Sequence, residues 1–465
     1  MIAFHNSLSG RLEAFEPLDP PRVGLYTCGP TVHDFAHIGN FRAYVWEDLL
    51  RRHLEYRGFE VRHVMNITDV EDKIIRKAAE AGVPIGEWTA RFTQAFFEDV
   101  RTLRLKPAHH YPRATEHIPE MIELLRRLEE RGHTYVADGS LYFRIASFPG
   151  YGRLSGLDRE RLIAGARVDA DEYGKDDPAD FVLWKAAKPG EPTWDSPWGP
   201  GRPGWHIECS AMSMKYLGET FDIHTGGIDN KFPHHENEIA QSEGATGRPF
   251  VRYWLHCAHL VVGGEKMSKS LGNFYTLREL LDRGHPPRLI RHVLISTHYR
   301  KPLNFTFEAL DQAGAELARI DDLRRRLADE AAGRRGPATM AERVEAAERA
   351  FGERLDDDLN VSGALGEVFR LVREANTALD RGELTAADAE TIEGFFERAD
   401  AVIGTLLPWD AQEEIDPEVT RLAQEREAAR RRRDWATADR LRDEIAARGY
   451  QVEDTPRGPR LKRRR

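Results

Sequence analysis

Four residues with metal-binding side chains stand in three well-separated segments of the chain. Cys28 follows an apolar stretch, Cys209 lies in GWHIECSAM, and His234 and Glu238 lie in PHHENEIA. Because His234 and Glu238 are four positions apart, both side chains would lie on one face of a helix and could reach one ion. Two sulfurs, an imidazole and a carboxylate are acceptable zinc ligands. His235 is a second candidate for the imidazole ligand.

These residue types also have common structural roles. A lone cysteine usually behaves as a small buried hydrophobe, and histidine and glutamate on a helix are often surface residues. Spacing alone therefore leaves both a metal site and a structural role open.

Two segments carry residues that suit a polyphosphate. PTVHDFAHIGN places His37, Gly39 and Asn40 at the expected start of a helix, where free backbone N–H groups and the helix dipole attract phosphate. EKMSKSLGN places Lys266 and Lys269 among small hydroxyl residues, which is typical of a loop that binds phosphate. The structural alternatives are a helix cap for the first segment and a solvated lysine loop for the second.

A third segment, HTGGIDN, suits a nucleoside. Gly226 would allow the backbone to approach a ligand closely, and Asp229 could accept a hydrogen bond from a ribose hydroxyl. Most Gly-Gly pairs are only turns, so this segment by itself is weak support.

A parallel sheet is the element that can bring these segments together. VGLYTC is predicted as a strand, HIGNFRAYVWEDLLRRHLEYRGF as a helix and VRHVMNIT as the next strand, which is the beginning of a nucleotide-binding fold. FDIHTGGID and WLHCAHLVV are predicted to continue the sheet later in the chain. Between them, the pair Asp138-Gly139 indicates a β-hairpin.

The expected fold is therefore α/β, with a Rossmann-like parallel-sheet catalytic domain that an insertion divides. Long Ala/Leu/Arg/Glu helices follow and predict an α-helical bundle, and a small C-terminal module ends in GPRLKRRR. The predicted segments are the first half of the catalytic domain, the insertion, the second half, the bundle and the C-terminal module, at residues 1–118, 119–201, 202–304, 305–405 and 406–465.

Composition excludes several classes of protein. The chain has 465 residues, 41% apolar and 31% charged, without an apolar run of the roughly 20 residues that a membrane helix needs. Three cysteines do not suggest a disulfide framework, and we expect a cytoplasmic protein with free thiols. The net charge of −10 argues against indiscriminate nucleic-acid binding but permits a local basic surface.

The combination of motifs resembles the class I aminoacyl-tRNA synthetases, and within them the cysteinyl-tRNA synthetases. HIGN and KMSKS occur in that order, and CGPTVHDFAHIGN, NITDVEDKI, GWHIECSAM and DIHTGGIDNKFPHHENEIAQSE look like that family. The resemblance continues through LDDDLNVSGAL and RDWATADRLRDEIAARGYQVEDTPRGPRLKR, so it spans essentially the whole chain. The first motif usually ends in histidine in this class, whereas here it ends in Asn40, whose side chain can donate a hydrogen bond to phosphate but carries no charge.

The resemblance implies activation of L-cysteine by ATP, with Mg²⁺ expected, and its transfer to tRNA(Cys) by a protein expected to be a monomer and not to bind membranes. It implies one zinc ion per chain, bound by Cys28, Cys209, His234 and Glu238. It implies ATP-binding residues His37, Gly39, Asn40, Gly226, Asp229, Lys266 and Lys269, of which His37, Asn40, Lys266 and Lys269 would be catalytic. It implies that the residues enclosing the amino acid are Thr31, Thr68, Trp205 and His224.

Two other functions share some of these features. A tRNA-independent cysteine ligase of thiol biosynthesis would have the same metal and ATP motifs, but the tRNA-binding character of 305–465 argues against it. A non-catalytic RNA-binding paralogue would not need intact HIGN and KMSKS segments. Transfer of cysteine to tRNA distinguishes the synthetase from both.

Overall fold

A four-stranded parallel sheet lies at the centre of the computed structural model, which describes residues 1–157, 179–268, 271–331, 333–409, 417–432, 434–455 and 458–463. The strands lie in the spatial order β10 (Val251–Cys257), β9 (Phe221–Gly227), β3 (Arg22–Thr27) and β4 (Glu60–Met65). β3 and β9 are adjacent although the insertion separates them in sequence. The predicted α/β fold with a divided parallel sheet is confirmed.

Helices and short strands flank this sheet. α1 connects β3 to β4, and the buried face of α1 includes Phe41, Val45 and Leu49. A two-stranded antiparallel pair lies at the N-terminus, and β1 of this pair contacts β10. These elements are β1 (Ala3–Asn6), β2 (Arg11–Ala14), α1 (Ile38–Tyr56), α2 (Asp72–Ala81), α3 (Ile85–Thr102), α6 (Trp205–Leu217) and α7 (His234–Thr246).

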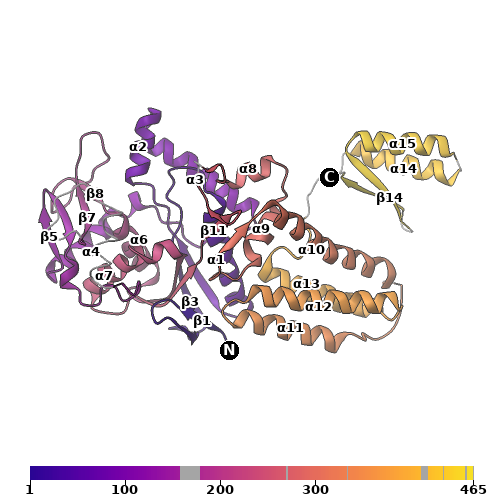
Figure 1. Ribbon diagram of the computed structural model, residues 1–465, viewed down its shortest axis with the longest axis horizontal. Helices are drawn as coiled ribbons and strands as arrows, with labels where there is room; N and C mark the ends of the chain where they lie inside the picture. The colour runs from indigo at the N-terminus through magenta and orange to yellow at the C-terminus, as the bar shows by residue number, and fades with distance from the viewer. Residues whose placement is uncertain are drawn as a thin grey trace. The chain divides into compact units, whose positions relative to one another are not determined.

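The insertion forms its own antiparallel sheet in the described part of the chain, with α4 nearby (Figure 1). The predicted hairpin is present, because Asp138 and Gly139 have φ angles of 47° and 75° between β5 and β6. β7 and β8 extend this sheet and were not predicted from the sequence. The elements are α4 (Ile118–Glu130), β5 (Thr134–Ala137), β6 (Ser140–Phe143), β7 (Phe181–Ala186) and β8 (Gly201–Pro203).

After β10 the chain forms a small three-stranded sheet and then long helices. β11 pairs with both β12 and β13. Helices α11, α12 and α13 lie side by side (Figure 1). The elements are β11 (Leu260–Val262), β12 (Glu265–Lys266), α8 (Leu277–Asp282), α9 (Pro287–Ser296), β13 (Leu303–Phe305), α10 (Phe307–Arg326), α11 (Ala341–Asp356), α12 (Val361–Asp380) and α13 (Ala386–Ile403).

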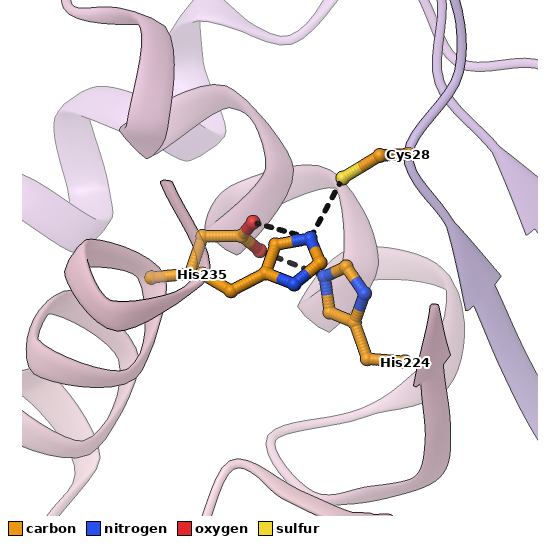
Figure 2. A group of neighbouring side chains, drawn as sticks. Cys28, His224 and His235 are labelled. Carbon is orange, nitrogen blue, oxygen red and sulfur yellow. Dashed lines mark hydrogen bonds and ion pairs between the residues drawn. The ribbon is translucent and has the colours of Figure 1, made fainter. Parts of the chain in front are cut away.

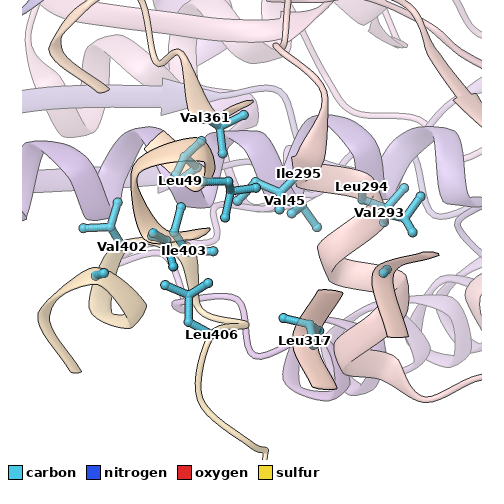
Figure 3. Close-up of a cluster of buried hydrophobic side chains, with 14 of the residues drawn as sticks. Val45, Leu49, Val293, Leu294, Ile295, Leu317, Val361, Val402, Ile403 and Leu406 are labelled. Atoms are coloured by element: carbon cyan, nitrogen blue, oxygen red, sulfur yellow. The ribbon is translucent and has the colours of Figure 1, made fainter. Parts of the chain in front are cut away.

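One hydrophobic core joins the helices of the sheet domain to the helical bundle (Figure 3). It contains Leu49 from α1, Leu294 from α9, Leu317 from α10, Val361 from α12 and Ile403 from α13, all buried. The predicted domain boundary near residue 305 therefore falls inside a shared core, and residues 1–407 form one compact unit.

Residues 408–465 form a second compact unit. It contains two helices and a hairpin, whose small core includes Val419, Leu422, Leu441 and Ile445. Its elements are α14 (Pro417–Arg431), α15 (Trp435–Ala447), β14 (Tyr450–Thr455) and β15 (Gly458–Arg463). Within the described residues of both units, every helix is too short or too polar to cross a membrane.

Candidate functional site

The four predicted metal ligands converge at the carboxyl ends of β3 and β9. Cys28 directly follows β3, Cys209 lies in α6, and His234 and Glu238 lie on one face of α7. One ligand atom from each of the four residues lies within 4.8 Å of the other three. Cys28 is half-buried and the other three are buried. The structure thus brings together residues that are remote in sequence, at the edge of a parallel sheet where ligands usually bind.

A second group of potential ligands overlaps the first (Figure 2). Cys28, His224, His235 and Glu238 also have ligand atoms within 4.8 Å of one another. The Cys28 sulfur is 3.2 Å from Nε2 of His235, and Nε2 of His224 is 3.0 Å from Oε2 of Glu238. Distances alone therefore do not show whether His234, or His224 together with His235, would bind the ion.

Burial shifts the pKa of two members of the group. Enclosure of the Cys28 sulfur, followed by its hydrogen bond with Cys209, raises the pKa of the Cys28 thiol well above its usual value. Burial lowers the pKa of His234 to about 3, so its ring is neutral and able to coordinate a metal. Glu238 Oε1 is buried and accepts no hydrogen bond from the described residues, although His234 Nε2 lies 3.1 Å away. Nε2 of His235 lies 4.0 Å from the same oxygen, so the carboxylate faces the candidate ligands.

Further histidines orient the candidate ligands. His206 Nδ1 lies 2.9 Å from Nδ1 of His234, and His256 Nε2 lies 2.9 Å from Nδ1 of His235. Nδ1 of His256 is in turn 2.8 Å from the hydroxyl of Ser7. Such outer contacts fix the ring orientation of a metal-binding histidine. Sequence analysis missed His206 and His256, because neither stands in a recognisable spacing and only the fold brings them to the group.

Of the four residues predicted to enclose the amino acid, Trp205 and His224 contact the candidate ligands, and Thr31 and Thr68 contact each other. Thr31 pairs with Thr68 in a parallel bridge. The Trp205 ring stacks on His234 at 4.2 Å between ring centroids and is 38% exposed, so it forms part of the accessible wall. His224 is buried against the Glu238 carboxylate.

Glu208 is another residue at this wall that the sequence did not indicate. The Thr68 hydroxyl donates to Oε2 of Glu208 at 2.9 Å. Burial raises the pKa of the Glu208 carboxyl well above its usual value, although the hydrogen bond from Thr68 opposes this. Glu208 lies within GWHIECSAM but was not predicted to act there, because a single acidic residue inside an apolar helix has no distinctive spacing.

The first phosphate motif forms the N-terminus of α1. The backbone N–H of Asn40 donates to Nδ1 of His37, and Oδ1 of Asn40 accepts from the backbone N–H of His37, both at 3.1 Å. This reciprocal capping box gives Asn40 a defined role at the position where the class usually has histidine. A Cβ atom on Gly39 would lie only 2.7 Å from Cε of Met267, so the two phosphate motifs are in contact.

The remaining predicted nucleotide contacts lie at the end of β9 and on the lysine segment. Gly226 packs against His235, since a Cβ there would be 2.8 Å from that ring. Asp229 is exposed in the short 3₁₀ turn Ile228–Lys231. Lys266 ends β12 and is exposed. Lys269 lies outside the described residues.

Comparison with protein families assigns the three parts of the chain. Residues 14–315 match the model described as tRNA synthetases class I (C) catalytic domain. Residues 350–407 match the DALR domain, and residues 412–459 match the cysteinyl-tRNA ligase anticodon binding domain.

Curated relatives match over their whole length. The chain is 50% identical over 464 residues to the cysteine–tRNA ligase of Solibacter usitatus, with 100% of both chains covered. It is 48% identical over 473 residues to the cysteine–tRNA ligase of Brachyspira hyodysenteriae, with 100% of this chain and 99% of that one covered.

Solved structures share the fold at low sequence identity. Mycobacterium tuberculosis methionyl-tRNA synthetase in complex with methionyl-adenylate matches with a TM-score of 0.61 and 16% identity, covering 83% of this chain and 92% of that chain. The Agrobacterium radiobacter LeuRS in its ternary complex matches with a TM-score of 0.59 and 12% identity, covering 84% and 85%.

Proposed function

The chain belongs to the cysteine–tRNA ligase family of class I tRNA synthetases, and from this premise we propose which residues carry out each step. In the first step the carboxylate of L-cysteine attacks the α-phosphate of ATP, and pyrophosphate leaves. In the second step the terminal ribose hydroxyl of tRNA(Cys) attacks the adenylate carbonyl, and AMP leaves. Neither step needs a side-chain nucleophile, so catalysis depends on positioning and on stabilisation of phosphate charge.

Zinc is the cofactor that the ligand chemistry favours, one ion per chain. Cys28, Cys209, His234 and Glu238 would hold it, and the observation that supports this most directly is that their four ligand atoms lie within 4.8 Å of one another. When bound, zinc would supply a soft Lewis acid that prefers the thiolate of cysteine to the hydroxyl of serine. Exclusion of serine by shape alone would be weak, because the two side chains differ by one atom.

Residues around the group would hold the rest of the amino acid. Trp205 covers the site by stacking on His234, and its partial exposure leaves a route for the substrate. Thr31 and Thr68 present backbone and hydroxyl groups from two adjacent loops, and His224 contacts the carboxylate of Glu238. These contacts would exclude water from the thiol pocket and orient the carboxylate toward ATP.

ATP would bind across the N-terminus of α1. His37, Gly39 and Asn40 lie there, and the positive end of the helix dipole favours phosphate. Gly226 and Asp229 would contact the nucleoside from the end of β9, and Lys266 and Lys269 would stabilise the leaving pyrophosphate together with Mg²⁺. We further propose that the protein is a monomer and that it acts in the cytoplasm.

The decisive experiment measures transfer of radiolabelled cysteine to a tRNA(Cys) transcript, together with cysteine-dependent exchange of pyrophosphate into ATP. We expect both activities, and a strong preference for cysteine over serine in the exchange. Exchange without transfer would indicate a tRNA-independent cysteine ligase. Absence of both in folded, metal-loaded protein would indicate a non-catalytic paralogue. The match of 412–459 to the anticodon binding domain supports the first outcome.

A further inference from the structure

We propose that Asn273 is a positioning residue for ATP activation, because its side chain ties together the two ends of the segment that carries the phosphate-binding lysines. This segment, here called the lysine loop, comprises residues 266–273, of which the structure describes 266–268 and 271–273. The inference rests on the proposed function, since it assigns a role within ATP binding. Asn273 itself is not placed in contact with substrate.

The amide of Asn273 makes one hydrogen bond with each of its polar atoms. Oδ1 accepts from the backbone N–H of Ser268 at 2.8 Å, and Nδ2 donates to the backbone carbonyl of Lys266 at 3.3 Å. A backbone bond from Leu271 N–H to the Ser268 carbonyl, at 3.2 Å, closes the same turn. Asn273 thus bonds on both sides of Met267, and asparagine is suited to this because one short side chain offers both a donor and an acceptor.

The chain that leaves Asn273 is fixed to the first phosphate motif. The Phe274 ring meets the His37 ring edge to face at 5.2 Å between centroids, and the backbone N–H of Ile38 donates to the Tyr275 carbonyl at 3.0 Å. Thr276 pairs with His37 in an antiparallel bridge and caps α8. The position of Asn273 is therefore set by the N-terminus of α1.

Met267 fixes the loop from its other side. It is partly buried against the main core, and its Cε lies where a side chain on Gly39 would otherwise be. Asn273 and Met267 together hold the start of the loop over the same helix N-terminus that would bind phosphate. Because the backbone of Lys266 is held in this way, Lys266 should lose less conformational freedom when it binds ATP.

Replacement of Asn273 by alanine should therefore affect ATP and spare cysteine. In pyrophosphate exchange we expect Asn273→Ala to raise the KM for ATP and to lower kcat about ten-fold, the order expected from two lost hydrogen bonds. The KM for cysteine should not change, because Thr68, Trp205 and His224 lie on other segments. Asn273→Asp keeps the acceptor for Ser268 but loses the donor to Lys266, so an intermediate loss is expected.

Asn304→Ala is the matched control. Oδ1 of Asn304 accepts from the backbone N–H of Gly264, also at 2.8 Å, in the turn between β11 and β12 that precedes the lysine loop. This variant removes a similar bond from the same small sheet without touching the loop, so near wild-type exchange is expected. Unfolding midpoints of the variants should agree with that of the wild type, and the aspartate variant provides the comparison if the alanine variant is unstable.

Two results would overturn the proposal. Wild-type exchange kinetics in Asn273→Ala would show that the lysine loop does not need the Asn273 hydrogen bonds. An equal loss of exchange activity in Asn304→Ala would show that any weakening of the small sheet has the same effect. Failure of the proposed function is a separate outcome, because the wild-type protein itself would then show no cysteine-dependent exchange.

Discussion

At the scale of single residues, Gly39 has a steric role that can be tested directly. An added Cβ would lie 2.7 Å from Cε of Met267 and 2.9 Å from the His37 ring. Gly39→Ala should therefore push Met267 away from the helix N-terminus and slow adenylate formation on the order of ten-fold or more. Stability should also fall, because displacing the His37 ring weakens the cap of α1, and the better helix propensity of alanine offsets only part of that loss. Rapid-quench kinetics and thermal unfolding measure the two effects, and unchanged kinetics would mean that Met267 moves without consequence.

The metal proposal is tested with two buried cysteines. Cys209→Ser replaces a soft thiolate by a hydroxyl that binds zinc poorly, so the zinc content and the affinity for cysteine should both fall. Cys257→Ser is the control, because Cys257 is equally buried but belongs to neither candidate ligand group. Elemental analysis of the purified wild type and both variants measures the zinc content. Full zinc content in the Cys209 variant would contradict the ligand assignment.

Residue types and spacing predicted only part of this site. The pair His234 and Glu238 could be placed on one helix face from sequence, but Cys28 and Cys209 lie too far apart in the chain for spacing to connect them. Their assignment came from the resemblance to a family. His206 and His256 could not be found, because they meet the candidate ligands only when α6, α7 and β10 are packed together.

At the scale of elements, Arg291 of α9 connects several helices that pack on the sheet domain. Its fully buried guanidinium bonds to the Asp48 carboxylate of α1 at 2.6 Å and to the carbonyl of Leu103 at 2.9 Å. Arg291→Met would leave a buried carboxylate with Arg52 as its remaining cation, so we expect a loss of about 3–5 kcal/mol in the free energy of unfolding. Urea denaturation of the wild type and the variant measures this difference in unfolding free energy.

Arg398→Met on α13 is the matched control for this experiment. Arg398 forms a bidentate pair with Glu348, but its side chain is half exposed. Solvent screens such a pair, so its loss should cost no more than about 1 kcal/mol. Equal losses of unfolding free energy in the two variants would mean that the buried Asp48–Arg291 pair stabilises the fold no more than an exposed pair does.

The same ion pair predicts an acid dependence of stability. Burial raises the pKa of the Asp48 carboxyl, but Arg291 and Arg52 outweigh it, and the net pKa is below the usual value. A carboxyl with a lowered folded-state pKa stabilises the fold at pH values above its unfolded pKa of about 3.9, and this contribution is lost as pH falls through the folded-state pKa. The difference in unfolding free energy between wild type and Asp48→Asn should therefore shrink below about pH 4. A difference independent of pH would contradict this.

Helices and strands could be predicted where their own residues carry the periodicity or the turn signal. The strand–helix–strand unit and the Asp138-Gly139 hairpin carry their own periodicity and turn residues, and both are present. β7 was missed because five of its six residues are buried, so FVLWKA shows no alternation, and the Pro- and Gly-rich sequence around it suggests irregular structure. The strand is defined by its pairing with β6 and β8, which local sequence does not encode.

At the scale of the whole molecule, the two compact units suggest a division of work. The residues proposed for activation lie within residues 1–407, whereas residues 408–465 have their own small core and an exposed Trp435. A chain ending at Leu407 should therefore keep cysteine-dependent pyrophosphate exchange and lose most tRNA charging. In the intact protein, charging should weaken as salt rises, because basic residues of the second unit would contact phosphates. Equal loss of both activities in a truncated protein with native circular dichroism would show that the second unit supports the active site.

The order of strands has a consequence for how the protein is made. A ribosome delivers β3 and β4 first, and then the entire insertion, before β9 emerges to take its place beside β3. Until then the edge of β3 that pairs with β9 is unpaired. While the insertion is being translated, Cys28 is already present, but Cys209, His234 and Glu238 are not. The proposed zinc site would be complete only after α7 has been translated, so we expect the ion to bind late, after the two halves of the sheet have joined.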